Sequence, residues 1–250
     1  MIVTEQLWLD YIDRLSKINA TATDKMRVYI ERNPDATMDE WIDYAYGLST
    51  AYGEAAAAWA AEMYDAIAIA SGANVEPAEP ADTAEYNDVR DAFWAIRKSS
   101  LNAMLLCTAV GRMVKRAGAD TVMRNAIRDK AYYAFIPHAD TCAFCISIAA
   151  EGWKRAYSNA MKNGHAAHIH GNCDCMYAVK FDPSTEYQGY NPDRYSEMLD
   201  GEPGRTSRDK INALRRQFYD ENRTEILAQK ADAYEKRKEL NASAAEELNA

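Results

Sequence analysis

One long amphipathic run in the first third of the sequence sets the fold class. From Trp41 to Ala70, apolar residues recur at intervals of three and four, which is the period of one helical face. Thr37 precedes this run and Glu40 follows three residues later, the pattern of a capping box at a helix N-terminus. We therefore predict one long helix whose aromatic residues face the core, within a mainly α fold built of long amphipathic helices.

Two more helices are predicted before residue 118. Residues 4–31 have the helical period, and we expect a break or kink at residues 19–23. Residues 84–117 are predicted to form another long helix with Gly118 as its C-cap, followed by a shorter basic helix. Cys107 falls on the apolar face of this helix, where we expect it to be a small buried hydrophobe.

Two short stretches of strand-forming residues follow the helical part. Residues 131–137 and 176–181 are rich in aromatic and apolar side chains, which is the composition of strands. If these two strands pair, the residues at the end of the first and the start of the second are brought together. Together with the sequence between them they would form a small α+β element. The whole chain is then expected to comprise a helical body at 1–130, the α+β element at 131–182, an extended linker at 183–206 and a polar C-terminal helix or tail at 207–250.

The metal-binding side chains are concentrated between these two strands. All four histidines and four of the five cysteines lie between His138 and Cys175. A Cys-x-x-Cys pair can hold one ion from a single turn, and a second group downstream can close a tetrahedron around zinc. We predict a structural site for one zinc per chain, stapling the α+β element and leaving no open position for a catalytic water. The candidate ligands are Cys142, Cys145, Cys173 and either His170 or Cys175.

Two other states of these cysteines compete with a metal site. In an oxidising compartment the cysteines would pair as disulfides, and in a thioredoxin-like setting Cys142 and Cys145 would be a redox pair. The N-terminal sequence has no basic start or apolar core of a signal peptide, and the Ala-rich run 55–73 is too polar to span a bilayer. A reducing cytoplasm is therefore expected, which favours metal over disulfide. His165 and His168 are weaker ligand candidates.

Charge is unevenly distributed along the chain. The formal net charge of −9 and the pI near 5.1 argue against a general nucleic-acid coat protein. Residues 1–100 have a balance of −10, whereas Arg97–Lys130 has a balance of +6. This basic stretch is the best candidate for contact with double-stranded DNA or an acidic partner, and a solvated helical face is the alternative. Its candidate contact residues are Arg112, Lys115, Arg116, Arg124 and Arg128.

We call the segment from His138 to Cys175 the cysteine window, and it resembles the corresponding segment of a known family. Thr-Cys-Ala-Phe-Cys at 141–145 and His-Gly-Asn-Cys-Asp-Cys at 170–175 are similar to the C-terminal signature of Mu F-like phage head morphogenesis proteins. These are also called minor head or minor capsid proteins, and the similarity is greatest to versions from actinobacterial phages. The family commonly has Pro and Arg where this sequence has Gly171 and Asp174.

The resemblance implies a structural virion protein of low copy number. Such a protein would lie inside the capsid near the portal, act in head assembly and in DNA packaging or delivery, and be present in the host cytoplasm during assembly. Its implied partners are the portal protein and the major capsid protein, with no membrane. We expect no enzyme, because the sequence has no Gly-rich phosphate loop, Gly-x-Ser-x-Gly or His-Glu-x-x-His motif. The alternatives are a zinc-dependent DNA-binding protein or nuclease, and a toxin-like effector.

Overall fold

A computed structural model describes most of the chain. The described residues are 1–99, 103–138, 141–158, 176–225, 227–228 and 231. They fall into two compact units, Met1–Tyr195 and the residues from Ser196 onward, and each unit is described by itself. The structure is mainly helical with small sheets, so the predicted mainly α class is confirmed, whereas the zinc staple of the α+β element stays a prediction.

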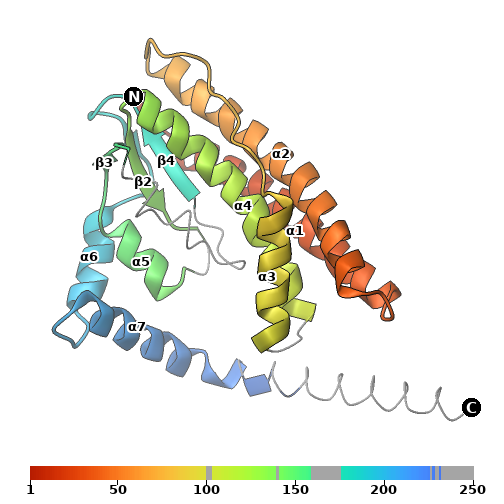
Figure 1. Ribbon diagram of the computed structural model, residues 1–250. Helices are drawn as coiled ribbons and strands as arrows, with labels where there is room; N and C mark the ends of the chain where they lie inside the picture. Colours follow the sequence, from red (N-terminus) through yellow and green to blue (C-terminus); the bar gives the residue numbers. More distant parts are fainter. Residues whose placement is uncertain (100–102, 139–140, 159–175, 226, 229–230, 232–250) are drawn as a thin grey trace, which may run out of the picture. The chain divides into compact units, whose positions relative to one another are not determined.

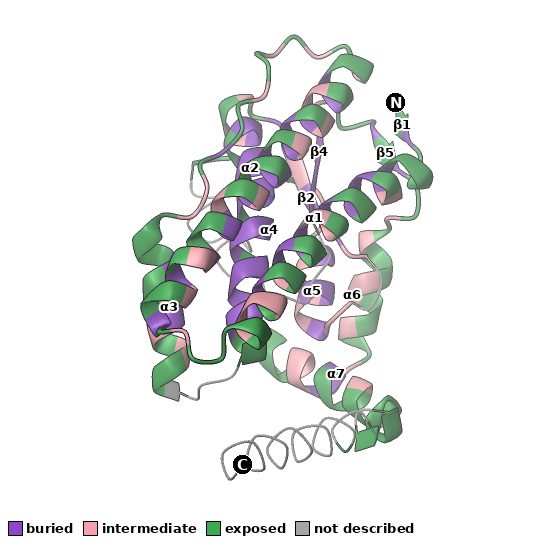
Figure 2. Cartoon of the chain, turned by 90° about the vertical axis from the view of Figure 1, so that its right-hand side faces the viewer, coloured by how far each residue is buried: buried purple, intermediate pink, exposed green. Residues whose placement is uncertain are grey.

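Long helices build the body of the first unit (Figure 1). They are α1 (Glu5–Arg32), α2 (Met38–Ala70), α3 (Tyr86–Ser99) and α4 (Ala103–Arg128). α4 is the central helix, because it packs against α1, α2 and α3 and is buried around most of its circumference. Figure 2 shows this as buried residues along α4, whereas α1 and α2 each keep an exposed outer face.

The capping box predicted for α2 is present. The Thr37 hydroxyl accepts a hydrogen bond from the Glu40 backbone N–H at 3.3 Å, and the Glu40 carboxylate accepts one from the Thr37 N–H at 2.7 Å. This reciprocal pair also lowers the pKa of Glu40, because the hydrogen bonds stabilise its carboxylate. The long helix that follows ends at Ala70, as predicted.

The break expected in α1 at residues 19–23 is wrong. The helix is continuous, and the hydroxyls of Thr21 and Thr23 donate to backbone carbonyls four residues earlier, at 2.7 and 2.9 Å. These hydroxyls are satisfied within the helix and do not compete with its backbone bonds. Ala22 is fully buried at the same place, so packing of the inner face outweighs the weak helix propensity of the sequence.

The single helix expected at 84–117 is two helices, α3 and α4, and the second runs on through Gly118. Gly118 is therefore not a C-cap, and the expected short helix after it is the end of α4. A Cβ added at Gly118 would lie 3.4 Å from the carbonyl oxygen of Ala56 in α2, which is an ordinary van der Waals contact, so the packing here would also accept alanine. Periodicity did not reveal the division, because the apolar period continues in both helices.

The two predicted strands pair. β2 (Tyr132–Ile136) is antiparallel to β4 (Met176–Lys180), with Tyr132 opposite Lys180 and Ile136 opposite Met176. A third strand, β3 (Lys154–Arg155), adds to the other edge of β2. β4 packs against α4, and α5 (Ala143–Ala149) packs against β2 (Figure 1).

Residues 183–195, expected as the start of an extended linker, are packed on the first unit. β5 (Glu186–Tyr187) pairs in parallel with β1 (Ile2–Val3) at the N-terminus. The buried Tyr187 hydroxyl donates to the Val179 carbonyl at 2.7 Å. The Lys180 ammonium donates to the carbonyls of Pro183 and Thr185 at 2.8 and 3.1 Å. We call residues 183–190 the strap.

The second unit contains the end of α6 (Pro192–Asp200) and α7 (Ser207–Glu221). Thr206 and Asp209 form a capping box at the start of α7, with the Asp209 N–H donating to the Thr206 hydroxyl at 3.2 Å. The polar helix expected from residue 207 is thus present up to Glu221. Most of the expected tail lies outside the described residues.

Candidate functional site

The first half of the predicted metal site is a pair of thiols at the start of α5. Cys142 is the N-cap residue, and its Sγ accepts a hydrogen bond from the Cys145 N–H at 3.5 Å. The two Sγ atoms also lie 3.5 Å apart, far beyond the roughly 2.05 Å of a disulfide bond. Two thiolates bound to one tetrahedral zinc, each at about 2.3 Å, would lie about 3.8 Å apart. The observed spacing therefore suits a shared ion.

Packing against the sheet fixes the position of this pair. Cys145 is fully buried, and Ile146 and Ala149 of the same helix are buried with it, whereas Cys142 is partly exposed. The Tyr190 hydroxyl donates to the Ala149 carbonyl at the end of α5, at 2.8 Å. The thiols are thus carried on a helix that packs against β2 and is hydrogen-bonded to Tyr190 at its end, with Cys145 buried more deeply than Cys142.

The strand pairing places the end of β2 and the start of β4 at the same end of the sheet. Ile136, the last residue of β2, lies opposite Met176, the first residue of β4. Cys142 follows the first strand by six positions, and Cys175 immediately precedes the second in the sequence. The pairing on which the approach of the two ligand pairs depends is therefore present.

The remaining predicted ligands lie outside the described residues. These are His170, Cys173 and Cys175, and the weaker candidates His165 and His168 lie outside them as well. Among the residues that the structure describes, no three or more His, Cys, Asp or Glu side chains are grouped to hold a metal ion. The complete zinc site stays a prediction.

Gly152 and Trp153, in the middle of the window, connect it to the strap. Gly152 has a φ of +65°, which favours glycine, and it turns the chain after α5. The Trp153 ring then packs on two tyrosine rings. Its centroid lies 5.1 Å from that of Tyr187 and 6.0 Å from that of Tyr190. The Lys180 ammonium lies 4.7 Å from the same ring, and burial lowers the pKa of this lysine.

The predicted basic contact residues lie on α4, where two of them fasten the loop between α2 and α3. Arg124 forms an ion pair with Asp82 of this loop at 2.9 Å, and its guanidinium lowers the pKa of that carboxyl. Arg128 donates to the carbonyls of residues 76–77 at 2.7 and 3.0 Å and pairs with Asp129 at 2.8 Å. These arginines therefore act within the chain.

The other three basic residues differ in exposure. Lys115 is buried, Arg116 pairs with the buried Asp120 at 3.3 Å, and Arg112 is exposed. Burial raises the pKa of Asp120, although Arg116 opposes this shift. A cavity of about 610 Å³ beside them has charges of both signs in its wall. Its lining includes Arg112, Arg116, Arg124, Asp82, Glu85, Asp88 and Asp120.

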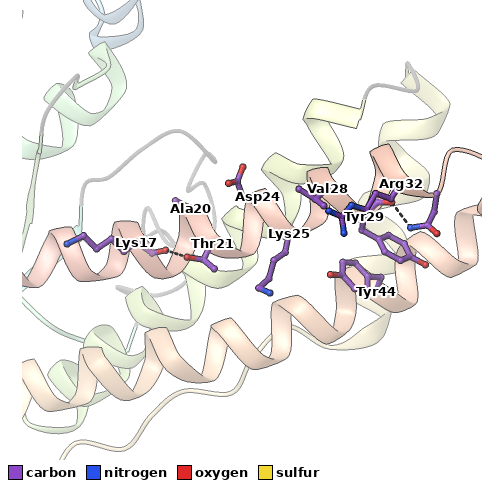
Figure 3. A pocket seen from close by; sticks show the side chains of 10 residues that line it. Lys17, Ala20, Thr21, Asp24, Lys25, Val28, Tyr29, Arg32 and Tyr44 are labelled. Atoms are coloured by element: carbon purple, nitrogen blue, oxygen red, sulfur yellow. Dashed lines mark hydrogen bonds between the residues drawn. The ribbon is translucent and has the colours of Figure 1, made fainter. Parts of the chain in front are cut away.

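A second hollow, which the sequence reasoning missed, lies between α1 and α2. It has a volume of about 720 Å³ (Figure 3), and we call it the α1–α2 groove. Three cations, Lys17, Lys25 and Arg32, line it together with the stacked rings of Tyr29 and Tyr44, whose centroids lie 3.9 Å apart. The sequence feature that could have indicated this groove is the spacing of the three cations. They follow one another after eight and seven residues, which places them on one face of α1.

Comparison with known proteins identifies the family of the chain. Within the described part, no helix is both long and apolar enough to cross a bilayer. A search of curated proteins and a search of solved structures gave no match. The family model described as VG15 protein matches residues 2–200, most of the chain. The finer assignment to the Mu F-like head morphogenesis proteins stays a prediction. The match shows that the chain belongs to the VG15 protein family, a family of phage virion-associated proteins.

Proposed function

We propose that this protein is a minor head protein of the Mu F-like type. It would lie inside the capsid near the portal and act in head assembly and in the packaging or delivery of DNA, without enzymatic activity. The observation that carries the proposal is the VG15 family match over residues 2–200, which makes the protein virion-associated. The cysteine window supports the finer assignment through its resemblance to the Mu F-like signature.

A structural zinc ion is part of this proposal. Cys142 and Cys145 would supply two thiolates, and Cys173 with either His170 or Cys175 would complete the site. The 3.5 Å spacing of the two described sulfur atoms fits this donor set. Four protein ligands would close the site, so the ion would staple the window to the sheet without binding a substrate.

The proposed partners are the portal protein and the major capsid protein. Contact with packaged double-stranded DNA through Arg97–Lys130 is supported by Arg112, whose side chain is exposed on α4. The carboxylate partners of Arg116, Arg124 and Arg128 weaken this part of the proposal, since paired charges attract phosphate less strongly.

The location can be tested on purified virions. Mass spectrometry should find the protein in low copy number, and it should resist added protease until the capsid is opened. A phage lacking the gene should assemble defective heads or package DNA poorly, and its portal should co-purify with the protein when both are expressed together. A deletion phage with normal, filled heads, or a protein found on the tail or outer surface, would contradict the proposal.

The zinc staple can be tested by elemental analysis of the purified protein. We expect about one zinc per chain, lost in Cys142→Ser and retained in Cys107→Ala, which removes a cysteine far along the chain in α4. Chelation should then destabilise the parent protein and leave Cys142→Ser unaffected. Absence of metal from protein purified under reducing conditions would refute the staple while leaving the virion location to be tested separately.

A further inference from the structure

The α1–α2 groove carries positive charge that no ion pair among the described residues neutralises. Lys17, Lys25 and Arg32 line the groove, and none of them forms an ion pair with another described residue. Asp24 also lines it but pairs with Arg27 at 3.1 Å, and Figure 3 shows its carboxylate directed away from α2. The groove therefore has a net positive wall on the more acidic half of the sequence.

The three cations form a line along α1. They are separated by eight and seven residues, which correspond to about 12 and 10.5 Å at 1.5 Å per residue. In Figure 3 they follow the groove from one end to the other, and Lys25 extends toward α2. A ligand that engages all three must carry negative charges repeated over roughly 22 Å.

Aromatic rings form part of the same wall. Tyr29 and Tyr44 stack with an interplanar angle of 12°, and both are half-buried. They lie at the Arg32 end of the groove, with one ring contributed by each helix (Figure 3). Cations that follow a backbone, next to aromatic surfaces on which bases stack, are the combination found in single-strand binding grooves.

We propose that the α1–α2 groove binds a single strand of nucleic acid. Its phosphates would lie against Lys17, Lys25 and Arg32, and a base would pack on the Tyr29–Tyr44 pair. A base can pack on this tyrosine pair only when it is not stacked within a duplex, which favours a single strand. The unpaired cations distinguish this groove from the basic stretch on α4, where most charges have partners.

The test compares two triple variants with the same change in charge. The groove variant is Lys17→Ser/Lys25→Ser/Arg32→Ser, and the control is the α7 variant Arg208→Ser/Arg215→Ser/Arg216→Ser, whose residues no proposed contact uses. All six side chains are exposed, so both variants should fold, which circular dichroism checks. Binding of a fluorescent oligothymidylate of about 12 nucleotides is measured by anisotropy between 50 and 200 mM salt.

The salt dependence supplies the expected magnitude. Each phosphate contact on a single strand contributes about −0.7 to the slope of log K against log salt, so three contacts contribute about −2. This weakens binding roughly 20-fold between 50 and 200 mM salt. The groove variant should lose about 2 units of slope, and the α7 variant should keep the parent slope. Tyr44→Leu should weaken binding about tenfold with the slope unchanged, because stacking does not release counterions.

Several results would overturn the proposal. Equal losses of affinity in both triple variants would indicate general electrostatic attraction. If the parent protein did not bind the oligonucleotide at 50 mM salt, the groove would not be a site for single-stranded nucleic acid. A duplex bound as tightly through the same three cations would show a general polyanion surface. Displacement of the oligonucleotide by polyglutamate as effectively as by unlabelled oligothymidylate would point to an acidic protein partner.

Discussion

The close approach of α4 to α1 predicts opposite effects for two glycine-to-alanine substitutions. Gly111 in α4 and Gly47 in α2 both lie inside long helices, where alanine improves helix propensity by about 0.8–1 kcal/mol. A Cβ added at Gly47 meets no atom within 4 Å. A Cβ added at Gly111 would lie 2.8 Å from Oδ1 of Asn19 and 2.9 Å from Oγ1 of Thr23, both on α1.

The two oxygen atoms that face Gly111 have little freedom to move. The Asn19 side chain is buried, and the Thr23 hydroxyl donates to the Asn19 carbonyl at 2.9 Å. Overpacking of this kind costs about 1–3 kcal/mol. Gly111→Ala should therefore change the free energy of unfolding by between about zero and −2 kcal/mol, while Gly47→Ala raises it by up to about 1 kcal/mol. The gain in propensity cancels between the two variants, so they should differ by about 1–3 kcal/mol.

Urea denaturation of the full chain, followed by far-UV circular dichroism, measures this difference. Thermal melting should show it as a shift of about 2–4 °C per kcal/mol. The Gly111→Ala/Asn19→Ala double variant should recover part of the loss, because the shorter side chain vacates the space that the new methyl group needs. If both alanine variants were equally stable, or if Gly111→Ala were the more stable one, the close contact between α1 and α4 would be refuted.

Three further substitutions test other parts of the structure. Thr37→Ala should lower the free energy of unfolding by about 1 kcal/mol through loss of the capping box, whereas Thr21→Ala, in the exposed middle of α1, should change it little; equal effects would contradict the capping role. Tyr187→Phe should cost about 1 kcal/mol in urea denaturation, because the Val179 carbonyl loses its donor, and an unchanged midpoint would contradict the buried hydrogen bond that anchors the strap. Burial raises the pKa of the Cys107 thiol to about 11 from an ordinary value of 9.0, so iodoacetamide should label the native protein at Cys107 only slowly near neutral pH, as read by mass spectrometry. The folded state binds this proton more tightly, so the thiol's contribution to stability is present below pH 9.0 and is lost as the pH rises to about 11; a Cys107→Ala variant with the same alkaline loss of stability would contradict this.

Sequence patterns that extend over a few residues correctly predicted the helices and strands whose formation depends mainly on neighbouring residues. The capping box at Thr37 and the three/four period after it specify α2, because both signals act within a few residues of one helix. Strand composition likewise located β2 and β4 to within a residue or two, whereas their pairing came from the structure. The Cys-x-x-Cys spacing also predicted that Cys142 and Cys145 lie within reach of one ion.

The pairing of charged side chains and the formation of the α1–α2 groove could be seen only in the tertiary structure. Counting charged residues along the sequence indicates that Arg97–Lys130 is strongly basic. The count cannot show that Asp82, in a loop far away in the sequence, forms an ion pair with Arg124. The α1–α2 groove exists only because two helices from different parts of the chain lie side by side, with Tyr29 on one and Tyr44 on the other. The sequence by itself thus determined the helical class, the long capped helix and the thiol pair, since periodicity, capping and ligand spacing are short-range. The tertiary structure decided which charges remain unpaired and where the strap packs, because those depend on contacts between residues far apart in the chain.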